Sequence, residues 1–237
     1  MSIGKAALVV GAGVLGSRVL GLLRDVVLAG VLGDTVSGDL FQAAFFLPDL
    51  LFYLMAGGFL SITFIPILSA HLAKDDEAGA WASFVAVARP LAAVMAVLTV
   101  VAMVFADRLV EFLFVDLAGL FGLDAADSVL VGEARDDLVR LTRIVLPAQF
   151  FFMLGSLLMG VQYARTRFAL PALAPIVYTL GIIVGGLIGF ALAEGDPTPD
   201  GFVWGALAGA VVGNFALQWA GARRVGLRLP RGVPFRH

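Results

Sequence analysis

Charged side chains interrupt the first long apolar stretch of the chain. Arg18, Arg24 and Asp25 lie in a segment that is otherwise suited to crossing a membrane as a helix. At about 100° per residue, these side chains share an arc of roughly 120° with Ser17 and Gly21. Charged residues within a membrane by default face the protein interior or a water-filled cavity. The two arginines therefore predict a cation-lined site for an anionic or polar substrate.

The next apolar segment carries a matching polar stripe. Asp39, Gln42, Asp49 and Tyr53, with Phe46 between them, follow a spacing of three and four residues. On a helix this spacing keeps the side chains within roughly 80° of one another. We expect this stripe to face the charged side of the first helix and to complete the site.

The two stripes should meet at Arg24 and Asp49, which lie at a similar depth if the two helices form a hairpin. We expect these two residues to pair. Two interpretations of the charges remain open. They line a substrate cavity, or they neutralise each other and pin the first helix to the second, because buried ion pairs can set register without a ligand.

The composition defines the environment of these residues. Of 237 residues, 60% are hydrophobic and 14% are charged, and the mean hydropathy is +0.98. Soluble domains have about 45–50% apolar and about 25% charged residues, so this is an integral membrane protein. We predict an all-α fold, a bundle of six transmembrane helices in residues 1–222, followed by a basic tail in residues 223–237. The charge-free runs place the spans at about 3–32, 40–72, 80–106, 138–164, 169–193 and 201–222.

The distribution of Lys and Arg predicts the orientation. With the N-terminus inside, most Lys and Arg outside the spans fall on the cytoplasmic side. We therefore expect a multi-pass protein with both termini in the cytoplasm. The longest connection, residues 107–137, should lie on the outside.

Several chemistries are disfavoured by residue counts. The chain has no Cys and two His, which excludes a thiol nucleophile and a Cys-ligated zinc site and argues against a metal centre. We expect no enzymatic activity and no cofactor. The net charge of −2 argues against nucleic acid as a partner.

The spacing of the glycines matches two known patterns, a dinucleotide-binding fingerprint and the small-residue ridges of closely packed helices. Gly11, Gly13 and Gly16 match a dinucleotide-binding fingerprint, but that motif requires an alternating α/β domain, which the downstream apolar runs do not provide. A nucleotide-dependent enzyme is thus a distant alternative. Further along, small residues recur every four positions and predict close helix packing. They are Gly181, Gly185 and Gly189 in the fifth expected span, and Gly205, Gly209 and Gly213 in the sixth.

Four segments, which follow one another in the same order as in a known family, resemble that family. They are SRVLGLLRD at 17–25, FFLP at 45–48, FIPIL at 64–68 and TRFALPALAP at 166–175. Together they are similar to the N-terminal part of the MurJ (MviN) lipid II flippases, within the multidrug/oligosaccharidyl-lipid/polysaccharide exporter superfamily. The resemblance implies two six-helix lobes around a central cavity in the bacterial cytoplasmic membrane. Such a protein moves the undecaprenyl-pyrophosphate-linked peptidoglycan precursor, lipid II, outward by alternating access.

The resemblance also implies site residues and partners. Arg18, Arg24 and Asp39 match charged cavity positions of the family, and Ser17 matches a polar one. The implied partners are a lipid-linked pyrophosphate, membrane lipids and a second six-helix lobe, in the same longer chain or in another subunit. Where the family has an Arg pair and a Glu, this chain has Phe52-Tyr53 and Gly57. The alternatives are therefore a MurJ-like paralogue or superfamily exporter with another polyprenyl-linked or amphiphilic cargo, and a non-transporting membrane scaffold.

Overall fold

The computed structural model describes residues 3–33, 35–56, 64–116 and 133–229, and every regular element in those ranges is helical. The all-α membrane class expected from the composition is confirmed. In chain order the elements are α1 (Ile3–Leu32), α2 (Val36–Ala56), α3 (Ile65–Ala73), α4 (Glu77–Val104), α5 (Ala106–Glu111), the π-helical turn η2 (Phe112–Asp116), α8 (Glu133–Ala164), α9 (Ala169–Leu192), α10 (Asp200–Gly209), the π-helical segment η3 (Ala210–Ala216) and α11 (Leu217–Arg224).

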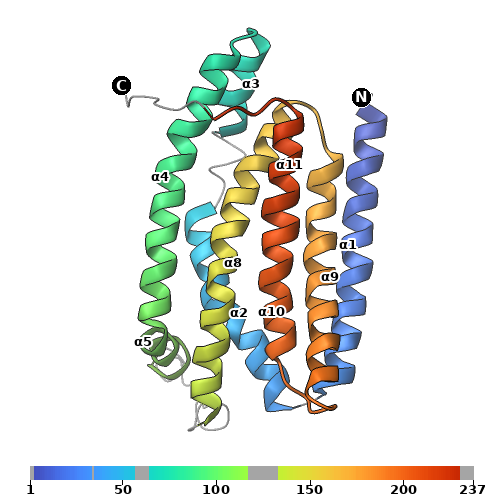
Figure 1. Cartoon of the computed structure of the whole chain (residues 1–237), viewed down its shortest axis with the longest axis vertical. Helices are drawn as coiled ribbons and strands as arrows, with labels where there is room; N and C mark the ends of the chain where they lie inside the picture. Colours follow the sequence, from blue (N-terminus) through green and yellow to red (C-terminus); the bar gives the residue numbers. More distant parts are fainter. Residues whose placement is uncertain (1–2, 34, 57–63, 117–132, 230–237) are drawn as a thin grey trace.

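The long helices stand side by side in one bundle (Figure 1). α4, α8, the continuous rod of α10, η3 and α11, then α9 and α1 follow one another across the view, and α2 crosses behind them. α9 packs against both α10 and α1, whereas α2 packs mainly against α8. Helices α1, α2, α8 and α9 are thus the four elements that can enclose a space between them.

Within the part of the chain that the structure describes, five helices are long and apolar enough to cross a membrane. These candidate spans are Ala7–Leu32, Glu77–Val104, Glu133–Ala164, Ala169–Leu192 and Asp200–Arg224. The expected span at 40–72 differs, because the structure describes two helices there, α2 and α3, and residues 57–63 lie outside the described part. The predicted count of six spans is therefore not matched.

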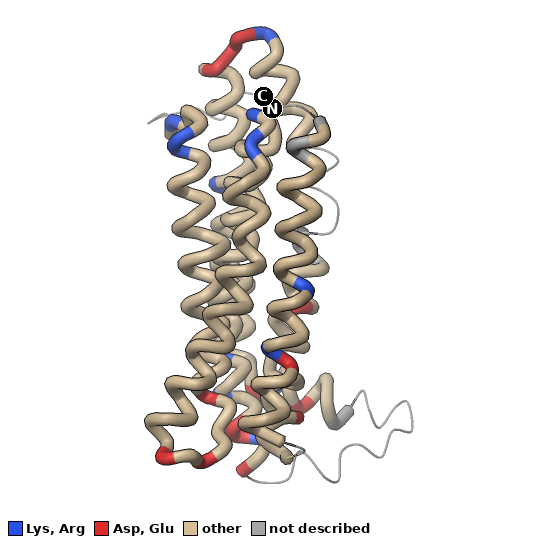
Figure 2. The backbone as a smooth tube through the Cα atoms, turned by 90° about the vertical axis from the view of Figure 1, so that its right-hand side faces the viewer, with Lys and Arg blue, Asp and Glu red and all other residues tan. Residues whose placement is uncertain are grey.

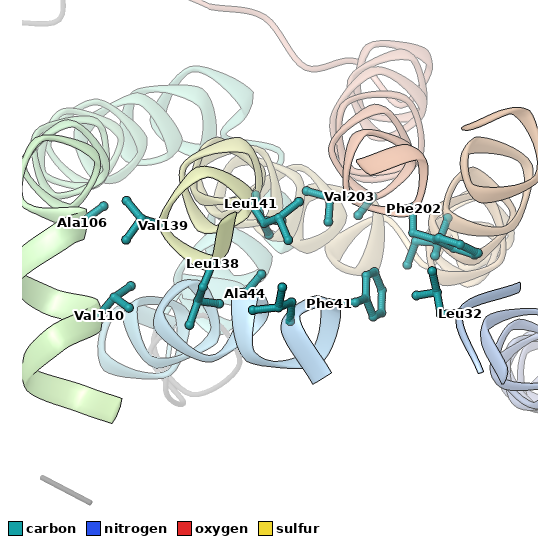
Figure 3. Close-up of a cluster of buried hydrophobic side chains, with 14 residues drawn as sticks. Leu32, Phe41, Ala44, Ala106, Val110, Leu138, Val139, Leu141, Phe202 and Val203 are labelled. Atoms are coloured by element: carbon teal, nitrogen blue, oxygen red, sulfur yellow. The ribbon is translucent and has the colours of Figure 1, made fainter. Parts of the chain in front are cut away.

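A cluster of buried hydrophobic side chains closes one end of the bundle (Figure 3). Phe41 of α2 packs edge-on against Phe202 of α10, with ring centroids 5.9 Å apart, and Leu32 of α1 joins the same cluster. Leu138 of α8 is fully buried beside them. Burial of large apolar side chains at this junction fixes the relative positions of α1, α2 and α8, which surround the site described below.

The close helix packing predicted from the small-residue ridges is confirmed, and the two ridges pack against each other between α9 and α10. At three places the backbones approach so closely that a Cβ on α9 would lie 2.5–2.8 Å from a Cα on α10. The pairs are Gly185 with Gly205, Gly189 with Gly201, and Gly181 with Gly209. Gly213, expected in the α10 ridge, faces Ala174 and Val177. Ala174 and Val177 belong to α9, so Gly213 packs on that helix as well, and Gly201 extends the ridge by one helical turn toward the start of α10.

The two ends of the bundle differ in charge (Figure 2). The end where α1 begins and α11 finishes carries Lys74 and four arginines at helix ends: Arg165, Arg167, Arg223 and Arg224. Acidic residues dominate the opposite end. This is the asymmetry on which the predicted orientation rests.

Candidate functional site

A cavity with a volume of about 760 Å³ lies between α1, α2, α8 and α9. It extends from Gly33 and Gly38, at the turn between α1 and α2, inward to Phe52 and Gln149. A volume of several hundred Å³ is in the range of small-molecule binding sites. We refer to it as the central cavity.

Four of the eight predicted site residues line the central cavity. Arg24 and Asp25 come from α1, and Gln42 and Asp49 come from α2. The polar stripes read from helical periodicity thus meet at one place in the fold. Their meeting depends on α2 crossing behind α8 and α10 toward the end of α1, as seen in Figure 1.

Arg24 makes its ion pair within α1. Its Nη2 and Nε donate to Oδ1 of Asp25 at 2.8 Å and 3.0 Å. Among the described residues Asp25 is its only hydrogen-bonded partner, and the expected pair with Asp49 is not formed. A flexible arginine side chain reaches the adjacent residue at little cost, whereas α1 and α2 make few contacts with each other. The ion pair consequently does not pin α1 to α2.

Asp49 lies exposed in the wall of the cavity. Among the described residues no side chain forms a hydrogen bond or ion pair with its carboxyl group. With Arg24 at +1 and Asp25 and Asp49 at −1 each, the ionised side chains of this wall sum to −1. This wall is charged, but with a net charge of −1 it does not bind anions strongly by itself.

The other four predicted residues do not line the cavity. Ser17 donates its hydroxyl to Val14 of its own helix at 3.2 Å, and Arg18 is exposed on α1. Asp39 lies exposed in the first turn of α2, where an acid is favourable beside the positive end of the helix. Tyr53 is 75% exposed.

The cavity wall opposite the charged residues was not predicted from the sequence. Gln149 and Phe152 of α8 and Tyr178 of α9 line the cavity together with Phe52 of α2. The Phe152 ring lies 6.2 Å from that of Phe52 and 5.0 Å from that of Tyr178, measured between centroids. Gln149 is 2% exposed and is the only strongly polar residue between Arg143 and Ser156. A lone polar residue in an apolar span was the signal that could have identified it.

The cavity therefore has one charged wall and one aromatic wall, within a bundle of membrane-crossing helices. This arrangement defines an integral membrane protein with a cavity that has room for a ligand with both polar and apolar parts. The chain belongs to the MurJ lipid II flippase family, since the family model described as Lipid II flippase MurJ matches residues 28–236.

Individual relatives agree with this assignment. The chain is 32% identical over 213 residues to the probable lipid II flippase MurJ of Bdellovibrio bacteriovorus, covering 88% of this chain and 38% of the relative. It is 31% identical over 225 residues to the lipid II flippase MurJ of Burkholderia cenocepacia, covering 95% and 41%. The corresponding protein of Rhizobium tropici is 28% identical over 240 residues, covering 99% and 43%. The chain thus spans less than half the length of these relatives.

Proposed function

We propose that this chain acts as one lobe of a lipid II flippase and supplies half of the cavity through which the lipid-linked peptidoglycan precursor crosses the cytoplasmic membrane. The observation that carries the proposal is the central cavity, where Arg24, Asp25 and Asp49 face an aromatic wall in a chain of this family. The role is transport, with no catalytic step.

Arg24 is the proposed contact for the pyrophosphate. Its ion pair with Asp25 is partly exposed, with 33% and 59% of the two side chains accessible. Such pairs stabilise a protein by about 0–1 kcal/mol. A pyrophosphate offers more charge and a bidentate geometry that suits a guanidinium. We therefore expect the ligand to displace Asp25 from Arg24.

The aromatic wall is the proposed contact for the less polar parts of the cargo. Phe52, Phe152 and Tyr178 form a continuous row of ring contacts across the cavity. Gln149, buried between the two walls, can both donate and accept hydrogen bonds. An amphiphile is thus accommodated with its charge on α1 and its apolar portion on α8 and α9.

A second six-helix lobe is required by this proposal. The described wall sums to −1, so further cations must come from elsewhere to hold a pyrophosphate. Rocking between inward-facing and outward-facing states also needs a second bundle for the first to move against. We assign Ser17, Arg18, Asp39 and Tyr53, which lie outside the central cavity, to surfaces that the second lobe would approach. Both termini are proposed to lie in the cytoplasm.

One observation favours a second candidate function. Phe52 lines the central cavity at a position where the resemblance implies an arginine. The cavity of this chain is therefore less cationic than that of a lipid II flippase. A MurJ-like exporter for a less highly charged polyprenyl-linked or amphiphilic cargo is the alternative.

Complementation of a flippase-depleted bacterium tests the proposal. Three forms are compared: the 237-residue chain, the chain fused to the second lobe of a relative, and the fusion carrying Arg24→Ala. Arg108→Ala is the matched control, because Arg108 also has an acidic neighbour, Glu111, but lies outside the cavity. We expect growth only from the fusion and its control. Growth from the chain alone, or equal growth with Arg24→Ala, would contradict the proposal.

A further inference from the structure

A second cavity lies at the basic end of the bundle and shares no lining residue with the central cavity. Its volume is about 710 Å³. It is formed by the connection between α8 and α9, residues 165–168, together with the end of α11 and the residues that follow it. We refer to it as the basal cavity.

The lining of the basal cavity is cationic. Arg165, Arg167 and Arg224 contribute three positive charges and Glu77 one negative charge, a sum of +2. Arg165 is already engaged, since it forms an ion pair with Glu77 and its guanidinium lies 5.7 Å from the ring centroid of Trp81. It acts as part of the wall and neutralises the single acid.

Arg167 and Arg224 are the available cations. Both are exposed, and neither guanidinium group has a hydrogen-bond or ion-pair partner among the described residues. Two free guanidinium groups beside one cavity, with its only acid already paired, are favourable for an anion.

The backbone adds donors at the same place. Helix α9, 24 residues long, begins at Ala169, and its N-cap residue Phe168 provides no side-chain hydrogen bond. Phe168, Ala169 and Leu170 all line the cavity. The first N–H groups of a helix lack intrahelical partners and carry partial positive charge.

The C-terminal end of α11, which carries partial negative charge, also lies at this cavity. Its terminal carbonyl groups accept hydrogen bonds from the chain that follows, Gly221 from Val225 at 3.2 Å and Ala222 from Leu227 at 3.0 Å. Gly226, with φ of 99°, allows the chain to turn back for these contacts. The positive end of α9 is therefore the uncompensated one.

The depth of the basal cavity matches that of lipid headgroups. One candidate span ends at Ala164, the next begins at Ala169, and another ends at Arg224. Residues 165–168 thus lie where the apolar spans stop. Basic pockets between membrane helices at this level recognise anionic lipid headgroups.

We propose that the basal cavity binds the phosphate group of an anionic phospholipid, with Arg167, Arg224 and the first N–H groups of α9 as its ligands. A phosphodiester with an uncharged headgroup, as in phosphatidylglycerol, carries one negative charge and lowers the net charge of the lining from +2 to +1. A choline headgroup would place an ammonium ion beside the arginines, so phosphatidylcholine is disfavoured. This site is independent of the cargo proposed for the central cavity.

Lipid binding to the purified 237-residue chain tests the proposal. The chain in a neutral detergent is titrated with dioleoylphosphatidylglycerol or dioleoylphosphatidylcholine, and bound lipid is counted by native mass spectrometry. Arg167→Gln/Arg224→Gln removes the two free cations. Arg223→Gln/Arg228→Gln is the matched control, because it removes the same charge from the same end outside the basal cavity.

We expect one tightly bound phosphatidylglycerol, weakened about tenfold to thirtyfold by the cavity substitutions and about twofold or less by the control. Arg167→Lys/Arg224→Lys, which keeps the charge, should retain most of the binding. Equal losses in the two glutamine variants would indicate attraction to a basic surface and overturn the site. Equal binding of phosphatidylcholine would also overturn it.

A third titration distinguishes the source of the phosphate. Inorganic phosphate at millimolar concentration should displace little of the bound phosphatidylglycerol. Full displacement, together with stabilisation of the chain by phosphate in the absence of lipid, would make the ligand a soluble phosphate and contradict the lipid assignment. Thermal unfolding of each variant confirms that the comparison concerns folded protein.

Discussion

Arg24 and Asp25, neighbours on α1, form an ion pair of 2.8 Å on the wall of the central cavity. The pair occupies the guanidinium that the cargo is proposed to bind. Since partly exposed pairs are weak, we propose that an anionic ligand displaces Asp25 from Arg24. Substitution of either Arg24 or Asp25 therefore tests whether this pair controls anion binding.

Removing the charge of Asp25 should strengthen anion binding, whereas removing Arg24 should weaken it. We expect Arg24→Ala to reduce the affinity for farnesyl pyrophosphate about tenfold or more, because a charge-assisted hydrogen bond is lost. Asp25→Asn should raise that affinity about twofold to fivefold. Isothermal titration of the purified chain in detergent measures both changes.

The control for this pair is Asp107→Asn. Asp107 pairs with Arg143 at 2.6 Å outside the central cavity. Its loss should leave the affinity unchanged. If Asp25→Asn weakens binding as Arg24→Ala does, the pair is structural and Arg24 is not the anion contact.

Phe52→Arg should convert the cavity toward a more cationic one. Phe52 lines the cavity, whereas its neighbour Tyr53 is 75% exposed and does not. A guanidinium at position 52 should therefore improve farnesyl pyrophosphate binding about fivefold or more, and Tyr53→Arg should have little effect. The reverse result would mean that position 53 faces the ligand.

Gly185→Val should destabilise the packing of α9 against α10. A Cβ at Gly185 lies 2.5 Å from Cα of Gly205, so the helices must separate. We expect a loss of at least about 1–3 kcal/mol. Gly30→Ala on α1 is the contrasting change, since a Cβ there meets no atom within 4 Å, and it should stabilise by about 0.5–1 kcal/mol. Unfolding in detergent by denaturant measures both, and an unaffected Gly185→Val variant would contradict the packing.

The orientation can be tested because the chain contains no native cysteine. Thr198→Cys, in the turn between α9 and α10, should react with an impermeant thiol reagent added to intact cells. Lys74→Cys, at the end of α3, should react only after the cells are opened. The opposite pattern would place the termini outside.

Protonation of Asp76, the N-cap residue of α4, should destabilise the start of that helix. Its carboxylate accepts the backbone N–H of Gly79 at 2.8 Å and contacts Nδ1 of His71 at 2.8 Å, and these contacts lower its pKa, the first more than the second. A lowered folded-state pKa means that the stabilisation is present above the unfolded value of about 3.9 and is lost as the pH falls through the folded value. The stability difference between the chain and Asp76→Ala should therefore shrink toward zero below about pH 4. A difference that is constant from pH 6 to pH 2 would contradict this origin.

The sequence by itself determined the class of protein and the faces of its helices. The apolar composition requires a membrane. The 3.6-residue period of a helix assigns Arg24 to the polar side of α1 and Asp49 to the polar side of α2. The four-residue glycine spacing likewise predicted that α9 and α10 each pack closely against another helix. These features are local, so they depend on the chain alone.

The tertiary structure decided which faces meet and which partners are chosen. Periodicity does not set the rotation or offset of one helix against another, so the glycine pairs between α9 and α10 could not be predicted from the sequence, and Arg24 turns to Asp25 and not to Asp49. Gln149 and Tyr178 became site residues only because α8 and α9 pack beside α1 and α2. Contacts between residues distant in the chain follow from the burial of all helices together, which no single segment encodes.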